Sequence, residues 1–272
     1  MRNILVHLDS GAQTPKRLNM AAALAKGAGA RLVGVFAETA EAHRVGVVAE
    51  WPPESYRASA HAAQAAFQTV AGGLAGHAFM DLNRGVEDEL LAQFVDLSRH
   101  FDMIVCGQPT SEDARTPKDL IERVVVDSGR PVLAVPHAGE FPSIGHRPMF
   151  AWNDSREAAR AFVDAMPLVA PGAEALVVSI AKSGEKAALD YARRSLDLAV
   201  AHLAAYGVKA TADQTIVSDI GLMDALLNRA SDHGADLMAL GAFGGQGYPR
   251  FSRGSGSRFM LKHMTAPVLL SH

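Results

Sequence analysis

A glycine-rich segment near the C-terminus has the residue spacing with the clearest chemical meaning in the chain. Gly241 and Gly244 are followed, after nine further residues, by Gly254 and Ser255, and Ser257 comes two positions later. Glycine has no Cβ, so its backbone N–H can approach a phosphate closely, and positive φ has no steric penalty. A helix that begins at Gly254 and Ser255 adds N–H groups and a dipole that favour negative charge. We therefore expect this segment to bind an anion.

The same segment is basic, although the whole chain has a net charge of -3. Residues 241–263 contain no Asp or Glu, and their Lys and Arg side chains are Arg250, Arg253, Arg258 and Lys262. Charge-assisted hydrogen bonds are among the stronger ones, so this cluster suits a polyphosphate. Glycine spacing alone would also fit a flexible Gly/Ser loop with solvated arginines. The context of a strand, a loop and a helix favours the anion site.

Short β-type runs alternate with long Ala- and Leu-rich stretches, which predicts βαβ units and parallel sheets. The strands expected in the first half are Ile4–Asp9, Leu32–Ala37, Ala78–Leu82, Met103–Gly107 and Val132–Val135. Those expected in the second half are Met149–Asn153, Ala175–Ala181, Lys209–Val217, Leu237–Gly241 and Val268–Ser271. Residues 41–77 predict a loop followed by a crossover helix on the sheet, with a regulatory lid as the alternative.

The two halves also repeat parts of their sequence. Asp102-Met-Ile-Val-Cys-Gly107 parallels Asp236-Leu-Met-Ala-Leu-Gly241. Such a repeat predicts two domains of one fold, at residues 1–140 and 146–272, joined by the Gly- and Pro-containing connection 137–148. We expect each domain to be doubly wound α/β, with a five-stranded parallel sheet of order 3-2-1-4-5 flanked by helices.

In a sheet of this order, a ligand binds where the strand order reverses, beyond the carboxyl ends of the first and fourth strands. In the second half, Asn153 ends the first expected strand and Gly241 ends the fourth. In the first half, Asp9 ends the first strand, but Gly107-Gln-Pro109 follows the fourth without the glycine spacing. Pro109 also lacks a backbone donor. We therefore expect the first half to bind a phosphate-containing ligand poorly or not at all, and a different small ligand near Asp9 stays open.

The spacing of Gly, two residues, Gly, nine residues and Gly-Ser, followed by a helix and a final Pro-Val-Leu strand, resembles the nucleotide motif of the universal stress protein family. Segments 151–160 and 264–272 also resemble that family, especially its bacterial tandem members. The resemblance implies that the ligand is ATP, alone or with Mg²⁺. It assigns the phosphates and ribose to Gly241, Gly244, Gly254 and Ser255, with Ser257 close by.

The resemblance also assigns two residues outside the glycine-rich segment. Ile180, at the end of the second expected strand, matches a hydrophobic position that packs on adenine. Asn153 stands where ATP-binding members usually have an Asp that contacts the nucleoside. Asn retains an acceptor oxygen but lacks the charge, so we expect this contact to be weaker or differently selective.

Composition and missing motifs argue against several other classes of protein. The charge of -3 gives no electrostatic footprint for nucleic acid or an anionic membrane, and no run approaches the ~20 apolar residues of a membrane helix. The first strand is interrupted by His7, which argues against a signal peptide. Cys106 is the only cysteine, which suits a reducing cytosol, and we expect it to be buried and inert.

The chain also lacks a Walker A Gly-Lys-Ser/Thr, so any ATP turnover should be slow. It lacks the Gly-x-Ser-x-Gly elbow of hydrolases. It has no helical His pair with an intervening Glu, so no metal site is expected.

These features predict a cytoplasmic, nucleotide-binding stress-response or regulatory protein, in which ATP shifts conformation or association. We expect a homodimer of the tandem chain. Two alternatives stay open: a structural module of the same fold or a binder of another small molecule, and an α/β enzyme of the nucleotidyl-transfer or ATP-pyrophosphatase type. The enzyme is disfavoured because neither first strand is followed by a Ser-Gly-Gly phosphate loop.

Overall fold

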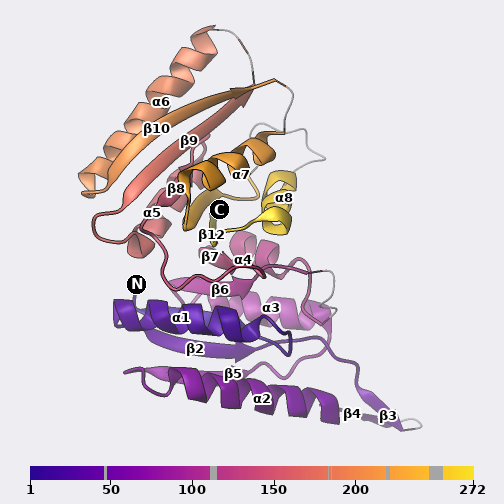
Figure 1. The fold of residues 1–272 in the computed structure, drawn as a ribbon. Coiled ribbons are helices and arrows are strands. Elements are labelled where there is room, and N and C mark those ends of the chain that lie inside the picture. The colour runs from indigo at the N-terminus through magenta and orange to yellow at the C-terminus, as the bar shows by residue number, and fades with distance from the viewer. Residues whose placement is uncertain (46–47, 111–114, 183, 185, 219–220, 245–253) are drawn as a thin grey trace. The chain divides into compact units, whose positions relative to one another are not determined.

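The structure is a computed structural model that describes residues 1–45, 48–110, 115–182, 184, 186–218, 221–244 and 254–272. The chain divides into two units, Met1–His137 and Ala138–His272, termed the N unit and the C unit. Each unit has a parallel sheet with helices on both of its faces (Figure 1).

The N unit contains two layers of helices around its sheet. Its parallel strands are β1 (Asn3–Leu8), β2 (Arg31–Phe36), β5 (His77–Asp81), β6 (Met103–Gly107) and β7 (Val132–Val135). They lie in the order β5-β2-β1-β6-β7. Its helices are α1 (Thr14–Ala28), α2 (Glu54–Ala71), α3 (Glu87–Ser98) and α4 (Leu120–Ser128). Helix α1 packs against α2 over one face of the sheet, and α3 packs against α4 over the other.

The C unit repeats this arrangement. Its strands are β8 (Pro148–Ala151), β9 (Glu174–Lys182), β10 (Lys209–Val217), β11 (Leu237–Gly241) and β12 (Val268–Ser271). They lie in the order β10-β9-β8-β11-β12. Its helices are α5 (Arg156–Ala165), the short 3-10 helix η1 (Met166–Leu168), α6 (Lys186–Ala205), α7 (Leu222–His233) and α8 (Ser255–His263). Helices α5 and α6 cover one face, and α7 and α8 cover the other (Figure 1).

Within the described residues, numbering the parallel strands along each unit gives the order 3-2-1-4-5, which confirms the predicted fold class. The central strands are apolar along most of their length because helices cover both faces of a parallel sheet. Residues 4–8 of β1 and 103–106 of β6 are buried without interruption. The core of each unit therefore lies between its sheet and its two helical layers.

Three local features differ from the sequence prediction. Helix α2 is the expected crossover helix and packs on β2 and β5, but the short antiparallel strands β3 (His43–Val45) and β4 (Val48–Glu50) that precede it were not predicted. Strand β1 ends before Asp9, whose carboxylate accepts a hydrogen bond from the backbone N of Gly11 at 2.9 Å and so turns the chain. Strand β8 ends at Ala151, so Asn153 lies in the following loop, where Asp154 has a φ of 56°.

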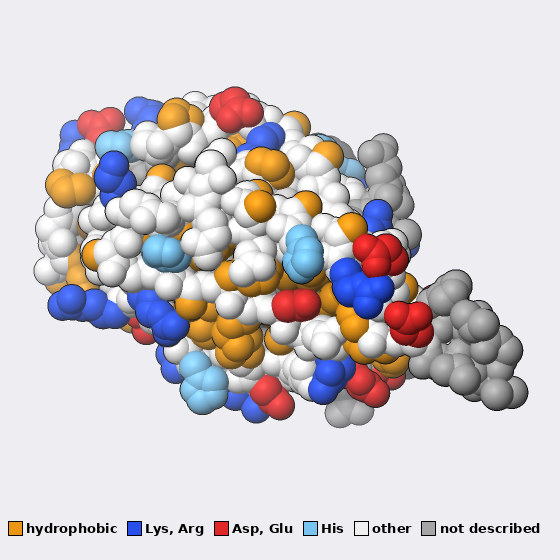
Figure 2. All heavy atoms as spheres, turned by 90° about the horizontal axis from the view of Figure 1, so that it is seen from below, with side chains coloured by type: hydrophobic (Ala, Val, Ile, Leu, Met, Phe, Trp, Pro, Cys, Tyr) orange, Lys and Arg blue, Asp and Glu red, His pale blue; other side chains and the backbone are white. Residues whose placement is uncertain are grey.

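Acidic and basic side chains are interspersed on the face shown in Figure 2. In the described part of the chain, no helix combines the length and the apolar character needed to cross a membrane.

Candidate functional site

The C unit has a cavity of about 360 Å³ beyond the carboxyl ends of β8 and β11. The loops that follow these two neighbouring strands lead to helices on opposite faces of the sheet, so the cavity lies at the point where the strand order reverses. Its lining residues are Ala151, Trp152, Asn153, Ser155, Glu157, Val178, Ile180, Leu222, Met223, Leu226, Leu240, Gly241, Phe243, Gly244, Gly254, Gly256 and Ser257. The volume is within the range of ~300–1,000 Å³ typical of small-molecule sites.

The loop after β8 presents an amide at the cavity. Asn153 is exposed, and its Oδ1 accepts a hydrogen bond from Ser155 Oγ at 2.7 Å. Ser155 is also the N-cap of α5, because its Oγ accepts a hydrogen bond from the backbone N of Ala158 at 3.1 Å. The N-cap serine therefore fixes the orientation of the Asn153 side-chain amide through its hydrogen bond to Oδ1.

The next residue anchors this loop to α6. The carboxylate of Asp154 accepts hydrogen bonds from Tyr191 Oη and from Ser195 Oγ, both at 2.8 Å. Ser195 Oγ in turn accepts a hydrogen bond from Trp152 Nε1 at 2.9 Å. Positive φ is uncommon for a residue other than glycine, and these contacts hold Asp154 in that conformation. The indole of Trp152 is thereby fixed in the cavity wall.

One side of the cavity is apolar. Val178 and Ile180 of β9 face it, and so do Leu222, Met223 and Leu226 of α7. Ile180 lies within β9, two residues before the strand ends, whereas the sequence placed it at the strand end. The contribution of α7 was missed by sequence reasoning, because its apolar side chains have the spacing of an ordinary core-facing helix.

The glycines that line the cavity lie close to α5, and the contact with backbone atoms at Gly241 leaves no space for a Cβ. A Cβ at Gly241 would lie 2.4 Å from the backbone N of Ala158, and a Cβ at Gly244 would lie 2.8 Å from Cδ of Glu157. Gly254 has a φ of 77° and is the N-cap of α8. Ser257 Oγ accepts a hydrogen bond from the backbone N of Phe243 at 2.9 Å, which ties the first turn of α8 to the loop after β11.

Ser255 is the assigned residue that is not among those lining the cavity; it is exposed at the first position of α8. The loop 245–253, with Arg250 and Arg253 of the predicted basic cluster, lies outside the described residues. Arg258 and Lys262 are on α8, and the guanidinium carbon of Arg258 would lie 3.6 Å from a Cβ at Gly254.

Sequence reasoning also missed Glu157, an acidic residue in the first turn of α5. It is only 4% exposed and lines the cavity beside Gly244. Arg156 Nε donates a hydrogen bond to Glu157 Oε1 at 2.8 Å. Burial by itself would raise the pKa of Glu157, but the hydrogen bonds from Arg156 and from its own backbone N–H hold that pKa below its usual value. Glu157 is therefore a carboxylate at neutral pH.

The corresponding place in the N unit can be identified from strand register. The first residue of β6 lies opposite Ile4 of β1, and the first residue of β11 lies opposite Pro148 of β8. Asp9 and Asn153 each lie five residues beyond these positions. Asp9 is therefore the structural equivalent of Asn153.

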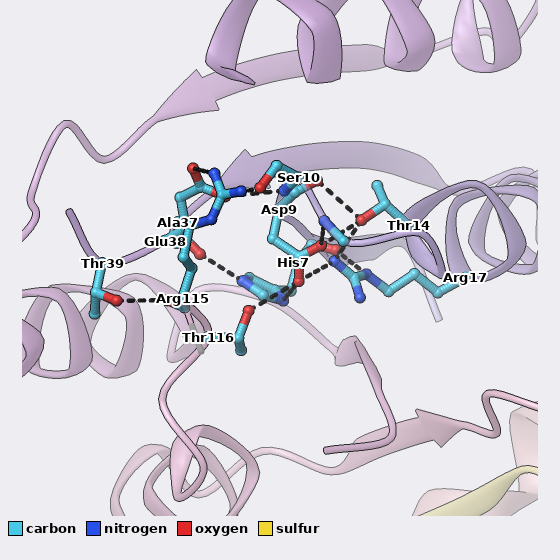
Figure 3. A network of polar contacts seen from close by, with 11 residues as sticks. His7, Asp9, Ser10, Thr14, Arg17, Ala37, Glu38, Thr39, Arg115 and Thr116 are labelled. Carbon is cyan, nitrogen blue, oxygen red and sulfur yellow. Dashed lines mark hydrogen bonds and ion pairs between the residues drawn. The ribbon is translucent and has the colours of Figure 1, made fainter. Parts of the chain in front are cut away.

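Asp9 takes part in a buried polar network (Figure 3). Its Oδ2 lies 2.6 Å from Arg17 Nη2 and accepts a hydrogen bond from Thr116 Oγ1 at 2.9 Å, and its Oδ1 accepts one from Thr14 Oγ1. Arg17 Nε also donates to the carbonyl oxygen of His7 at 2.6 Å. Burial would raise the pKa of Asp9, but Arg17 and Thr14 hold that pKa far below its usual value. The carboxylate is thus already satisfied.

A second buried carboxylate, Glu38, contacts Ser10 and Arg115, which are next to Asp9 and Thr116 in the sequence. Glu38 is 1% exposed and accepts hydrogen bonds from Ser10 Oγ at 2.6 Å and from Arg115 Nη1 at 3.2 Å. The carbonyl oxygen of Arg115 accepts hydrogen bonds from the backbone N of Thr39 at 2.7 Å and from Thr39 Oγ1 at 2.8 Å, and Figure 3 shows the second of them. The pocket beside Asp9 has a volume of about 30 Å³, enough for a water molecule or two but not for a nucleotide.

Other chemical groups do not add a site in the described part of the chain. No cluster of three or more His, Cys, Asp or Glu side chains there could hold a metal ion. Cys106 is buried in β6, where burial raises the pKa of its thiol to about 12. A thiol with that pKa is not a nucleophile at neutral pH, in agreement with the sequence prediction.

No protein-family model matches this chain, and a search of curated proteins found no match. Solved structures do match over both halves. A universal stress protein from Archaeoglobus fulgidus DSM 4304 has a TM-score of 0.67 at 15% identity, covering 99% of this chain and 95% of that one. A putative universal stress protein from Pseudomonas aeruginosa UCBPP-PA14 has a TM-score of 0.60 at 15% identity, covering 100% of this chain and 93% of that one.

A functionally unknown protein from Pseudomonas aeruginosa PAO1 gives a TM-score of 0.62 at 15% identity, covering 100% of this chain and 92% of that one. Similarity at this level of identity is similarity of fold. The chain therefore has the tandem α/β fold of the universal stress proteins.

Proposed function

We propose that the C unit binds an adenine nucleotide, ATP with Mg²⁺, and that the protein is a stress-response or regulatory module and not a dedicated enzyme. The observation that carries the proposal is the meeting of six of the seven residues assigned from the sequence at one cavity. They are Asn153, Ile180, Gly241, Gly244, Gly254 and Ser257.

The cavity has separate regions that suit the parts of a nucleotide. Ile180 and the neighbouring apolar side chains of β9 and α7 offer a surface for a purine base. Asn153 and Ser155 offer polar atoms at the strand end for the ribose or the base edge. Gly244 and the first turn of α8 bring backbone groups next to the space where phosphates would lie. We assign the phosphates to that end of the cavity.

A regulatory role follows from linkage. A ligand that binds one conformation or association state better than another shifts the equilibrium toward that state. The first turn of α8 and the loop after β11 are joined by the Ser257–Phe243 hydrogen bond, so a ligand that contacts both would favour their present arrangement. The proposal includes a homodimer of the tandem chain in the cytoplasm. Nucleic acid is not included, because the net charge is -3.

Nucleotide binding can be measured with a reporter that the chain already contains. The chain has two tryptophans, and Trp152 lines the cavity whereas Trp51 lies in the N unit. A Trp51→Phe variant would make Trp152 the single tryptophan, which can be excited selectively at wavelengths where tyrosine does not absorb. Titration with Mg²⁺–ATP should change its fluorescence saturably, and calorimetry on the wild type should give about one site per chain.

A blocking variant and a matched control test the location. Gly254→Arg places a long side chain at the cavity and should abolish binding. Gly207→Arg introduces the same side chain at nearly the same φ, 76° against 77°, at a place with open space after α6. Binding by the control and not by the blocking variant supports the cavity. Absence of saturation by the wild type at millimolar Mg²⁺–ATP would rule out the ATP-dependent role.

A further inference from the structure

A buried carboxylate stands beside the glycine that is assigned to the phosphates. A Cβ at Gly244 would lie 2.8 Å from Cδ of Glu157 and 2.9 and 3.1 Å from its two carboxylate oxygens. No side chain separates this carboxylate from the Gly244 backbone, and Glu157 lines the same cavity. A phosphate that accepted a hydrogen bond from the Gly244 backbone would therefore lie next to a like charge.

Among the described residues, the ion-pair partner of Glu157 is an exposed side chain. Arg156 is the ion-pair partner of Glu157, but its side chain is 81% exposed, so water screens the pair strongly. His272 follows β12 and lies near Glu157, with its Nδ1 2.9 Å from the carbonyl oxygen of Ala242. Arg258 lies beyond Gly254, on the first turns of α8. Within the described part of the chain, Glu157 is therefore a buried carboxylate in close contact with Gly244.

We propose that Glu157 determines the charge selectivity of the cavity: it disfavours a bare phosphate chain and makes polyphosphate binding depend on a divalent cation. The inference rests on the proposed function, because it concerns the same cavity. Like charges held together without water repel each other strongly. A hard divalent cation prefers carboxylate and phosphate oxygens, so a Mg²⁺ ion between the two groups would turn the repulsion into attraction. Adenosine carries no phosphate and should be indifferent to Glu157.

The test compares adenosine and ATP, each with and without Mg²⁺, in the wild type and in Glu157→Gln. Glutamine keeps the size of the side chain and removes its charge. We expect Glu157→Gln to strengthen Mg²⁺-free ATP binding by about tenfold or more and to change adenosine binding by less than about twofold. The factor by which Mg²⁺ increases the affinity for ATP should be smaller in this variant than in the wild type. Calorimetry and Trp152 fluorescence give the dissociation constants.

The matched control is Asp164→Asn, which removes an ion-paired carboxylate from the same helix away from the cavity lining. It should leave all four dissociation constants unchanged. Equal ATP-to-adenosine affinity ratios in the wild type and Glu157→Gln would overturn the selectivity proposal while leaving nucleotide binding intact. If neither adenosine nor ATP binds under any condition, the proposed function itself fails.

A measurement on the wild type alone serves if Glu157→Gln does not fold. Without Mg²⁺, affinity should fall along the series adenosine, AMP, ADP and ATP, because each phosphate adds negative charge at the cavity. Addition of Mg²⁺ should reverse the order for ADP and ATP. Affinity that rises along the series without Mg²⁺ would contradict the proposed role of Glu157.

Discussion

The strand ends of the two units carry equivalent residues in opposite settings. Asp9 is 4% exposed and paired with Arg17, whereas Asn153 is exposed at a cavity of about 360 Å³. Both positions lie where the strand order of a doubly wound sheet reverses, the usual place for a ligand. In the N unit, the molecule's own guanidinium and hydroxyl groups occupy that place. The comparison teaches that topology creates the crevice and that side chains decide whether it is filled from within.

In each unit a charged side chain also approaches a glycine near the end of the fourth strand: Gly107 is the last residue of β6, and Gly244 comes three residues after the end of β11. A Cβ at Gly107 would lie 2.6 Å from Nη1 of Arg17, whereas a Cβ at Gly244 would lie 2.8 Å from Cδ of Glu157. The N unit therefore presents a cation, which Asp9 already neutralises, and the C unit presents an anion whose partner is exposed. Neither unit has an uncompensated buried cation at this place among the residues described here.

The largest effect should come from breaking the buried pair of the N unit. Arg17→Met leaves the Asp9 carboxylate buried without its guanidinium partner, which should lower the free energy of unfolding of the N unit by about 3–5 kcal/mol. Urea unfolding followed by Trp51 fluorescence in a Trp152→Phe background reports on that unit. Arg123→Met, which removes a half-exposed pair with Asp127 on α4, should cost less than about 1 kcal/mol.

A similar loss for both variants would show that Asp9 does not depend on Arg17. Ligand binding by the C unit provides a further control, because neither substitution touches the cavity at Asn153.

Acid should weaken the N unit through the same carboxylate. The pKa of Asp9 in the folded protein lies below its usual value of 3.8, so the ionised pair stabilises the fold at every pH above about 4 and this stabilisation disappears as the pH falls further. Between about pH 4 and pH 2, the wild-type N unit should lose about 2 kcal/mol more than an Asp9→Asn variant. Unfolding curves across this range measure the difference, and parallel pH profiles would contradict it. Asp127→Asn, at an exposed pair, should keep the wild-type profile.

A smaller difference separates the first helices of the two units. Ser155 caps α5 with its side chain, whereas Gln13, at the N-cap of α1, makes no side-chain cap hydrogen bond. Ser155→Ala should therefore lower the free energy of unfolding of the C unit by about 1 kcal/mol, and Gln13→Ala should leave that of the N unit nearly unchanged. Equal effects would mean that the cap does not distinguish the two strand ends. Fluorescence of Trp152 and Trp51, each as the single tryptophan, follows the two units separately.

Much of the fold could be predicted from the sequence, because its signals are local. The apolar runs and the repeated Asp102–Gly107 and Asp236–Gly241 segments predicted the parallel strands, and the doubly wound class that they indicated supplied the strand order. The glycine spacing gave the start of α8 at Ser255. The β3–β4 pair was not predicted, because its strands are three residues each and their sequence has no strong turn signal.

The charged contacts could not be predicted from the sequence. Arg and Glu side chains on helices are usually solvated, so nothing local marks Arg17 or Glu157 as buried. Their burial depends on which strand end each helix faces, which is a property of the assembled unit. Asn153 and Ile180 were assigned by resemblance, and their places at the cavity rim and wall follow from the strands that carry them.

The smallest expected effect comes from making the two strand ends alike. Asn153→Asp gives the C unit the residue of the N unit, but at an exposed site where the new carboxylate stays hydrated and keeps the Ser155 hydroxyl as its donor. Stability should change by less than about 0.5 kcal/mol. Adenosine should bind about fivefold more tightly, because a hydrogen bond to a charged acceptor is about 1 kcal/mol stronger than one to an amide.

Adenosine is the right probe for this variant because it carries no phosphate, so repulsion by Glu157 does not enter. Asn228→Asp adds the same charge at an exposed position of α7 and should leave adenosine binding unchanged. Weaker adenosine binding by Asn153→Asp would mean that the strand-end residue acts through its amide donor. The two units would then differ in the chemistry of that amide as well as in space: Arg17 fills the strand end in the N unit, whereas the C unit has a cavity there.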